Sequence, residues 1–357
     1  MSKERSSFAA ALGVLALSAS VLALSPAMAA EELNALVWCD NTDPALIEPF
    51  EKANDVKVNL KVYEGTGAGL SILDQSQPGD WDVMVIDSID VQRIAKDRFL
   101  PLADDSLPLA GQFPEVRMDD ILVLDGNRYA VTEKWGFNAI SYNSKAFSAE
   151  DVSNLEKLTD PKFKGRLAIY DYYLPVEGMA SVATGTPTKD FSEATLAPVK
   201  DLMLKLKANA KLVGEVSASQ TALATGEVDV VVGAGEWVTA GLHAENPDLD
   251  FVIPSEGGIL WTQSLAILKD SKKADLALKF IQHVLSPEGQ AALATSSCYW
   301  GMPAQKDAAL TDEQKTTLKF SSEQQAKDLA ASNRYPAPDA DLDKKMQDLW
   351  NDVLQAN

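Results

Sequence analysis

The chain has 357 residues and carries 52 acidic against 32 basic side chains, so its formal net charge is −20 at pH 7. A surface this acidic repels nucleic acid and anionic lipid, and neither is expected as a partner. The length is too great for one ordinary hydrophobic core and favours two domains.

Residues 1–30 predict a secretory signal peptide. Lys3 and Arg5 make its start positive, residues 8–24 are mainly apolar, and residues 25–30 offer the small side chains of a cleavage site. The alternative, a membrane anchor, needs about 20 apolar residues and no such site. No later stretch of the sequence is long and apolar enough to span a bilayer. We therefore expect an exported protein without membrane insertion.

Helices and strands alternate in the first part of the mature chain. Asp43 followed by Pro44 marks a helix start, with the acid as N-cap and the proline in the first turn. The expected elements are strand 33–38, helix 43–54, strand 56–63, a glycine-rich turn at 65–69, a short helix from 70, strand 82–87 and helix 91–99. This order argues for an open α/β sheet.

A second α/β series follows an extended segment over residues 129–142. Its expected elements are strand 166–170, helix 194–208, strands 228–232, 251–254 and 265–268, helices 274–285 and 287–294, and a polar helical tail from 311. Two series joined by extended segments predict an α/β fold of two lobes. Each lobe would be an open mixed sheet flanked by helices, with a ligand cleft between the lobes.

Acidic and aromatic residues gather where four of the predicted strands end. All four ends contain an acid and three contain an aromatic: 38–41, 87–90, 170–173 and 233–237. Ligands of open α/β sheets bind at the carboxyl ends of the strands. Residues 257–267 add two glycines and an apolar strand that is interrupted by Trp261 and Gln263. An aromatic plate beside a hydrogen-bonding group suits a small-ligand cleft.

These segments resemble the cleft-lining segments of the bacterial spermidine/putrescine-binding proteins, which are the periplasmic receptors of ABC importers. Further stretches that resemble the family are Trp38 with 46–50, 134–136, 162–165, 277–281 and 285–288. The likeness covers nearly the whole mature chain. It implies a periplasmic-binding-protein fold, a small amine ligand, an ABC permease as partner, no cofactor and a monomer.

The resemblance also implies where the lobes divide. Lobe 1 is expected to combine residues 31–136 with 261–301, and lobe 2 to combine 137–260 with 302–357. The chain would then cross between the lobes near residues 134–138, 257–262 and 299–304.

Carried over one position at a time, the resemblance implies ligand contacts at the first two strand ends. Trp38 matches a ligand-stacking tryptophan, and Asn41 stands where the family often has a tyrosine. Asp87 and Ser88 fall at a serine-bearing turn. Two alternatives stay open, because Trp38 could belong to the core and Asp87 could cap the following helix.

The later strand ends depart from the family pattern. Glu236 matches an aspartate that contacts an amine, and Trp261 matches a cleft tryptophan for which a core position is the alternative. Gln263 replaces an aspartate that binds an ammonium, while Tyr172 and Pro175 stand where spermidine binders have an acid pair. The missing carboxylates argue against long polyamines, since a buried ammonium without a partner is costly.

Glutamine can donate a hydrogen bond to a carboxylate or a hydroxyl, which an aspartate cannot. We therefore expect a ligand with one ammonium and one polar or anionic end, such as 4-aminobutyrate or an amino-alcohol. A putrescine-like diamine stays open as the alternative. Asp40 is a candidate contact that could also be a solvated rim charge. The predicted ligand-binding set is Trp38, Asp40, Asn41, Asp87, Ser88, Asp171, Tyr172, Glu236, Trp237, Trp261, Gln263 and Trp300.

The chain contains only two cysteines, Cys39 and Cys298. In an oxidising compartment an even pair can form a disulfide, and two buried free thiols are the alternative. The resemblance implies a fold-back of the later segment beside the first strand, which would bring the two together.

The sequence does not indicate an enzyme. His243 and His283 are its only histidines, and it has neither a Gly-x-Ser-x-Gly motif nor a zinc-spaced histidine pair. The glycine run at 65–69 lacks the lysine–hydroxyl pair of a phosphate loop. We expect a receptor that delivers its ligand to an ABC permease, and a ligand-sensing subunit with the same fold is the alternative.

Overall fold

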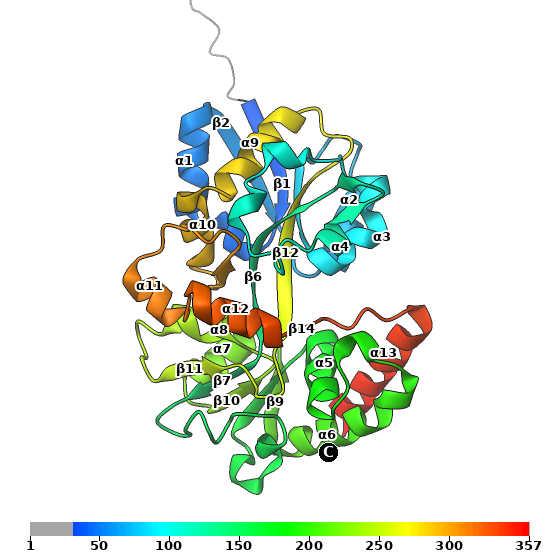
Figure 1. Cartoon of the computed structure of the whole chain (residues 1–357), viewed down its shortest axis with the longest axis vertical. Coiled ribbons are helices and arrows are strands. Elements are labelled where there is room, and N and C mark those ends of the chain that lie inside the picture. Colours follow the sequence, from blue (N-terminus) through cyan, green and yellow to red (C-terminus); the bar gives the residue numbers. More distant parts are fainter. Residues whose placement is uncertain (1–30, 357) are drawn as a thin grey trace, which may run out of the picture. The chain divides into compact units, whose positions relative to one another are not determined.

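The computed structural model describes residues 31–356 as an α/β body with two main sheets (Figure 1). The predicted signal peptide, residues 1–30, lies outside the described residues. Within residues 31–356 no helix has the length and apolar character needed to cross a membrane. The predicted fold class, with helices flanking two open mixed sheets, is confirmed.

The first sheet has the strand order β13-β6-β12-β3-β1-β2, and β14 pairs with the start of β12. Its strands are β1 (Glu31–Val37), β2 (Val56–Val62), β3 (Val83–Asp87), β6 (Val131–Asn138), β12 (Ile259–Ile267), β13 (Met302–Pro303) and β14 (Asn333–Arg334). β1 runs parallel to β2 and β3, whereas β12 runs antiparallel to β3 and β6.

Alternation along β1 explains why helices cover both faces of this sheet, since successive side chains of a strand point to opposite faces. Leu33, Ala35 and Val37 pack in one core and Leu36 in the other. The first core is closed by α1 (Pro44–Asn54), α9 (Ala274–Val284) and α10 (Pro287–Ala294). The second is closed by α2 (Thr66–Gln75), α3 (Ser88–Arg98) and α4 (Asp119–Leu122).

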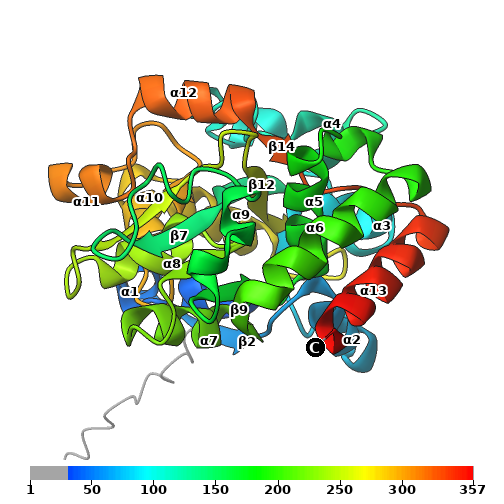
Figure 2. The same cartoon turned by 90° about the horizontal axis from the view of Figure 1, so that it is seen from below.

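The second sheet has the strand order β11-β7-β10-β8-β9. Its strands are β7 (Ile140–Asn143), β8 (Leu167–Tyr170), β9 (Ala210–Gly214), β10 (Val230–Val232) and β11 (Leu249–Val252). One face packs against α5 (Tyr173–Ala183), α6 (Leu196–Asn209) and α13 (Ala340–Gln355), and the other against α7 (Val216–Ala224) and α8 (Glu236–Thr239). Figure 2 shows α13 alongside α6, so the apolar stripe of the tail completes this core.

The chain passes from the first sheet to the second at Ala139, between β6 and β7, and returns between β11 and β12. The third passage follows β14, because β13 still pairs with β6 in the first sheet; it lies later than the expected 299–304. Before it, α11 (Asp312–Thr317) and α12 (Ser322–Ala331) adjoin a core that includes Trp135 and Phe137 of β6. The lobe boundaries themselves stay a prediction.

Two helices differ from the sequence expectation. The helix expected from residue 70 begins at Thr66, and Gly65 makes the preceding turn with a positive φ of 69°. A Cβ at Gly69 would lie 2.6 Å from the Tyr63 ring, so this glycine lets α2 pack closely on the sheet. Helix α5 was not predicted at all. Its Pro175 stands in the first turn, where a missing N–H breaks no helical hydrogen bond.

Candidate functional site

The candidate site lies where β1 and β3 reach their carboxyl ends. There β3 ends beside the middle of β12, and β12 pairs with the middle of β6. Residue Gln263 of β12 pairs with Asp87 of β3 on one side and with Lys134 of β6 on the other. The short helix η1 (Cys39–Thr42) follows β1 and brings Asp40 and Asn41 to the same place. The topology therefore brings three other chain segments, β1 with η1, β3 and β6, to Gln263.

Lys134 forms a fully buried ion pair with Asp40. Its Nζ lies 2.9 Å from Asp40 Oδ2, and both side chains have no exposed surface. The same Nζ donates to the carbonyl of Tyr299 at 2.9 Å and lies 4.1 Å from the centre of the Tyr299 ring. This ammonium thus has a carboxylate, a carbonyl and an aromatic face as its partners.

The amide of Gln263 is held inside the protein by its neighbours. Its Nε2 lies 3.3 Å from both Asp40 oxygens and 3.2 Å from Asn41 Oδ1 and from Glu133 Oε1, while its Oε1 accepts from the Tyr299 hydroxyl at 3.0 Å. Asn41 also donates to Glu133 Oε2 at 3.0 Å. Asp40, Asn41 and Gln263 are therefore brought together, but they face one another and Glu133.

Burial shifts the pKa values of the charged groups in this cluster. Burial and, next, the Asp40 charge raise the pKa of Glu133 to about 8. Burial lowers the pKa of Lys134, and the Asp40 charge opposes that shift. The sequence did not single out Glu133. The one feature of the sequence that could have indicated Glu133 is a carboxylate next to Lys134 within a strand that is otherwise buried.

Glu236 packs against β6 at Gly136, two residues after Lys134. It is the first residue of α8, is fully buried, and its two oxygens lie 3.2 Å from the N–H of Phe137. Burial raises its pKa to about 8. A Cβ at Gly136 would lie 1.7 Å from Glu236 Oε1 and 2.6 Å from the Trp261 ring. Only a glycine there allows Glu236 and Trp261 to pack side by side against β6.

Asp87 ends β3, beside Gln263 in the sheet. It stands at the N-cap position of α3, but its side chain makes no capping hydrogen bond. Burial raises its pKa to about 8, and the charge of Asp90 contributes. Its neighbour Ser88 is used within the sheet, since its Oγ contacts the Thr262 carbonyl at 3.2 Å and the Ser264 hydroxyl at 2.7 Å.

Three tyrosines from other segments contact one another in series. Tyr170 ends β8, Tyr172 precedes α5, and Tyr335 follows β14. Burial raises the pKa of all three hydroxyls, and the Asp87 charge is the next largest cause for each. The rings meet edge to face, with centres 6.1 Å apart for Tyr170–Tyr172 and 5.8 Å for Tyr172–Tyr335. Each keeps some solvent-exposed surface, as the lining of a crevice does.

The four tryptophans of the predicted set differ in their surroundings. Trp261 has a buried indole N–H that lacks a hydrogen-bond partner among the described residues, whereas the indole N–H of Trp38 lies near the Tyr63 hydroxyl. Such groups are rare and call for an explanation. Trp237 packs 5.1 Å from Tyr170, ring centre to ring centre, in the core beneath the second sheet. Trp300 packs closely over Gly241.

Asp171 lies apart from the other predicted contacts. Its side chain is exposed and accepts a hydrogen bond of 3.1 Å from the indole of Trp350 on α13. Tyr335 could not be singled out from the sequence because it lies in the polar tail, far from any predicted strand end.

A disulfide joins the two sides of the Lys134 cluster. Cys39 in η1 and Cys298 are bonded, with their Cα atoms 5.9 Å apart across a sequence separation of 259 residues. Trp38 and Asp40 flank the first cysteine and Tyr299 follows the second. The fold-back that the family resemblance implied is therefore present in the structure.

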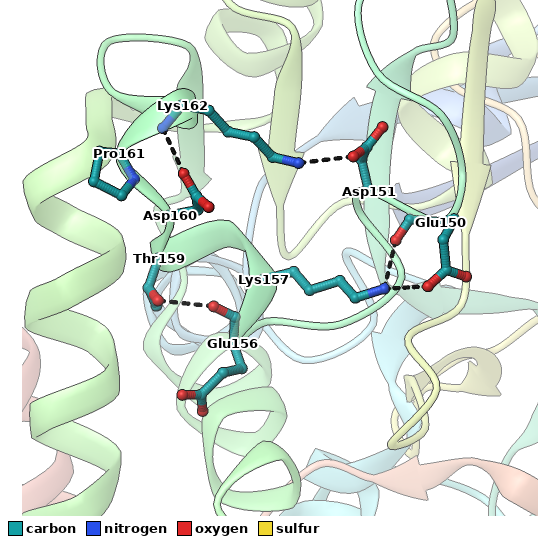
Figure 3. A pocket seen from close by; sticks show the side chains of 8 residues that line it. All are labelled: Glu150, Asp151, Glu156, Lys157, Thr159, Asp160, Pro161 and Lys162. Atoms are coloured by element: carbon teal, nitrogen blue, oxygen red, sulfur yellow. Dashed lines mark hydrogen bonds and ion pairs between the residues drawn. The ribbon is translucent and has the colours of Figure 1, made fainter.

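A surface hollow of about 510 Å³ lies in the loops before β8 (Figure 3). Its charged side chains pair with one another, Lys162 with Asp151 at 2.7 Å and Lys157 with Glu150. Most of these side chains are substantially exposed, so the hollow offers a ligand little beyond what water offers. In residues 31–356 no group of three or more histidine, cysteine or acidic side chains is arranged for a metal ion.

We expect the thermal stability of the ligand-free protein to fall as the pH rises from 5 to 8. Four buried carboxyls have a pKa raised to about 8 or 9, namely Asp87, Glu133, Glu177 and Glu236. The folded state holds their protons while the unfolded chain loses them near pH 4, so stability declines across this window. Each group contributes at most about 1.4 kcal/mol per pH unit.

Differential scanning calorimetry at several pH values measures this slope. Glu177 gives the simplest variant, because both of its buried oxygens lack hydrogen-bond partners in the described structure. Glu177→Gln cannot titrate and should flatten the slope. A melting temperature that rises between pH 5 and 8 would contradict the expectation.

Comparison with known proteins agrees with the family recognised in the sequence. The family model described as bacterial extracellular solute-binding protein matches residues 45–322. The spermidine/putrescine-binding periplasmic protein of Escherichia coli K12 is 28% identical over 276 residues, which cover 76% of this chain and 79% of that protein. The putrescine/agmatine-binding protein of Pseudomonas aeruginosa is 26% identical and covers 85% and 86%.

Among solved structures, the spermidine/putrescine substrate-binding protein PotD of Streptococcus pneumoniae superposes with a TM-score of 0.77 at 20% identity, over 91% of this chain and 99% of that one. This similarity shows the shared fold. The match of the family model over most of the chain shows more: the protein belongs to the bacterial extracellular solute-binding protein family.

Proposed function

We propose that this protein is the periplasmic receptor of an ABC importer and carries a small amine to a membrane permease. The observations that support this best are Asp87, whose carboxyl makes no capping hydrogen bond at the end of β3, and the series of edge-to-face contacts among Tyr170, Tyr172 and Tyr335. Carboxylates and aromatic faces are the two groups that bind an ammonium most strongly. The names of the relatives from E. coli and P. aeruginosa, as polyamine-binding proteins, point the same way.

In this proposal the ligand lies between the two sheets, with Trp38 and Trp261 beside it and Asp87, Tyr170 and Tyr172 around its ammonium. Closing the two lobes over the ligand would bury it and form the surface that the permease recognises. Residues 1–30 would direct secretion and then be removed. The protein acts by binding, as a monomer, and performs no reaction.

In this proposal the polar cluster around Gln263 positions the ligand site without lining it. Asp40, Asn41 and Gln263 hold η1 against β6 and β12 through hydrogen bonds and the buried ion pair. Glu236 holds β6 by accepting from the backbone N–H of Phe137. These residues would act on affinity through the position of Trp38 and Trp261 rather than by touching the ligand.

A thermal-shift panel tests the proposal. We expect the mature protein to be stabilised by at least one small amine among putrescine, spermidine, 4-aminobutyrate and 4-amino-1-butanol. A ligand at 100 times its dissociation constant adds about 2.7 kcal/mol of apparent stability. Trp261→Ala should abolish the shift, because it removes a wall of the site.

Trp81→Ala is the matched control, since Trp81 is a half-buried tryptophan that donates to Ser76 near α2 and lies outside the site. Its variant should keep the ligand-induced shift. If no amine of the panel stabilises the wild-type protein, the proposed ligand class is wrong.

A further inference from the structure

The segment formed by α11, α12 and the turn between them packs against elements of both sheets. Leu318, Phe320 and Leu329 of this segment share one apolar core with residues of both sheets, namely Trp135 and Phe137 of β6, Leu260 of β12 and Phe251 of β11. Figure 1 shows α12 at the level between the two sheets. The α11–α12 segment is therefore attached to both lobes at once.

Two neighbouring residues of the turn reach opposite lobes. The Lys319 ammonium lies 2.8 Å from Asp250 Oδ1, donates to the Phe251 carbonyl at 2.7 Å and lies 4.4 Å from the centre of the Phe251 ring. The Phe320 ring meets the ring of Phe113, which packs on β6, edge to face with centres 6.3 Å apart. One peptide unit thus links β11, the edge strand of the second sheet, to the first sheet.

The backbone of Lys319 adopts a left-handed conformation with a φ of 53°. Residues with a Cβ rarely adopt it, and glycine or asparagine is usual where a helix ends in this way. The fully buried amide of Gln325 supports the conformation by donating to the Lys319 carbonyl at 3.1 Å. The contacts of the lysine side chain with β11 offset the backbone strain, and a glycine could not make them.

The other end of α12 rests on the second passage between the sheets. Gly257 has a φ of 110°, and a Cβ there would lie 2.6 Å from the carbonyl oxygen of Ala331, the last residue of α12. The Asn333 N–H donates to the Gly258 carbonyl at 2.9 Å. Because α12 has 10 residues, it is about 15 Å long. A rotation of the lobes about this passage would therefore displace β11 from Lys319, near the far end of the helix.

The arrangement that Lys319 holds is one in which the lobes meet beside the candidate site. Trp261 of β12 is 7% exposed and lies in one core with Trp237 of α8 and Ala168 of β8. The packing of Trp261 therefore depends on how the second lobe is placed against the first.

We propose that the α11–α12 segment is a brace across the hinge and that Lys319 is its latch, which holds the second lobe in the arrangement of this structure. Lys319 would act on ligand binding as a positioning residue, through the contact of Trp261 with the second lobe. The inference rests on the proposed function only in that the two lobes rotate relative to each other.

Double electron–electron resonance on the ligand-free mature protein tests the latch. Spin labels at Gln92→Cys on α3 and Asp341→Cys on α13 occupy exposed positions of the two lobes, and the native cysteines stay unlabelled in their disulfide. We expect Lys319→Met to reduce the population at the main wild-type distance about threefold to tenfold relative to all other distances, as the loss of a charged contact does. Lys319→Arg should restore the wild-type distribution, because it keeps the cation.

Lys327→Met is the matched control. It removes an ammonium from the same helix, one that pairs with Glu323 inside α12, and should leave the distribution unchanged. Asp250→Asn removes the partner from the second lobe and should act like Lys319→Met. Equal distributions for Lys319→Met and Lys327→Met would overturn the latch, and so would a change in Lys319→Arg as large as that in Lys319→Met.

The same labels separate this inference from the proposed function. Putrescine, spermidine, 4-aminobutyrate or 4-amino-1-butanol should change the distances in the wild type when the lobes close over a small amine. A wild type that responds to none of the four would contradict the proposed function. The comparison of the ligand-free variants decides the latch in either case.

Discussion

Replacing Lys134 by methionine should lower the free energy of unfolding by about 3–5 kcal/mol, the cost of breaking a buried ion pair by removing one partner. Lys134 and Asp40 have no exposed side-chain surface, so water cannot replace the lost ammonium. Asp40 would be left with the Gln263 amide as its side-chain donor. Chemical denaturation of the ligand-free protein, followed by circular dichroism, measures the change.

Two further variants show whether the loss comes from the buried charge. Lys134→Met combined with Asp40→Asn removes both charges and should recover much of the stability, because neutral replacement of a whole buried pair is often tolerated. Lys327→Met breaks the exposed pair with Glu323 on α12 and should cost less than about 0.5 kcal/mol. A loss below about 1 kcal/mol for Lys134→Met would mean that Asp40 reaches solvent or takes up a proton at little cost.

The elements that the sequence predicted well are those with a strong local pattern. Helix α10 spans Pro287–Ala294 as expected, since Ser286 caps it and a proline opens it. The strands at 83–87 and 259–267 are buried on both faces, and their apolar runs marked them. Helix α5 was missed because its tyrosines and Pro175 indicated a strand end instead of a first helical turn.

The residue types of the site could be predicted from the sequence, but the pairs that their side chains form with one another could not. Acids and aromatics at strand ends indicated an amine site, and the ends of β1, β3 and β8 supply its residues. The sequence could not show that Asp40 pairs with Lys134, which lies 94 positions later, or that Gln263 would be held by four neighbours. Which acids pair within the protein depends on these long-range contacts, so the ion pair of Asp40 emerged only in the structure.

The same limit explains the expectation for Gln263. The resemblance placed Gln263 where the family has an aspartate that binds an ammonium. We therefore expected its amide to donate a hydrogen bond to the end of the ligand that carries no ammonium. In the structure its amide contacts Asp40, Asn41, Glu133 and Tyr299. Gln263 is thus engaged within the protein, and Lys134 supplies the cation beside Asp40. Whether Gln263 also reads the ligand stays a prediction.

Removing the disulfide should destabilise the protein by about 2–5 kcal/mol, since a bond that closes a long loop restricts the unfolded chain most. Cys39 and Cys298 are separated by 259 residues. The variant Cys39→Ser/Cys298→Ser and the wild type under a reducing agent should show the same loss in denaturant unfolding. Ellman titration of the denatured wild type should find no free thiol before reduction.

The loss should extend to ligand binding, because the bond ties η1 to the segment that carries Tyr299. Tyr299 supplies the carbonyl and the ring that hold Lys134, and its hydroxyl donates to Gln263. Without the bond, η1 and Trp38 can move away from β6, and the affinity for the preferred amine should fall at temperatures where the variant remains folded. An unchanged affinity would mean that the Asp40–Lys134 pair and the hydrogen bonds of Gln263 position this segment by themselves. An unchanged stability with the bond fully reduced would mean that the unfolded chain already holds the two ends together.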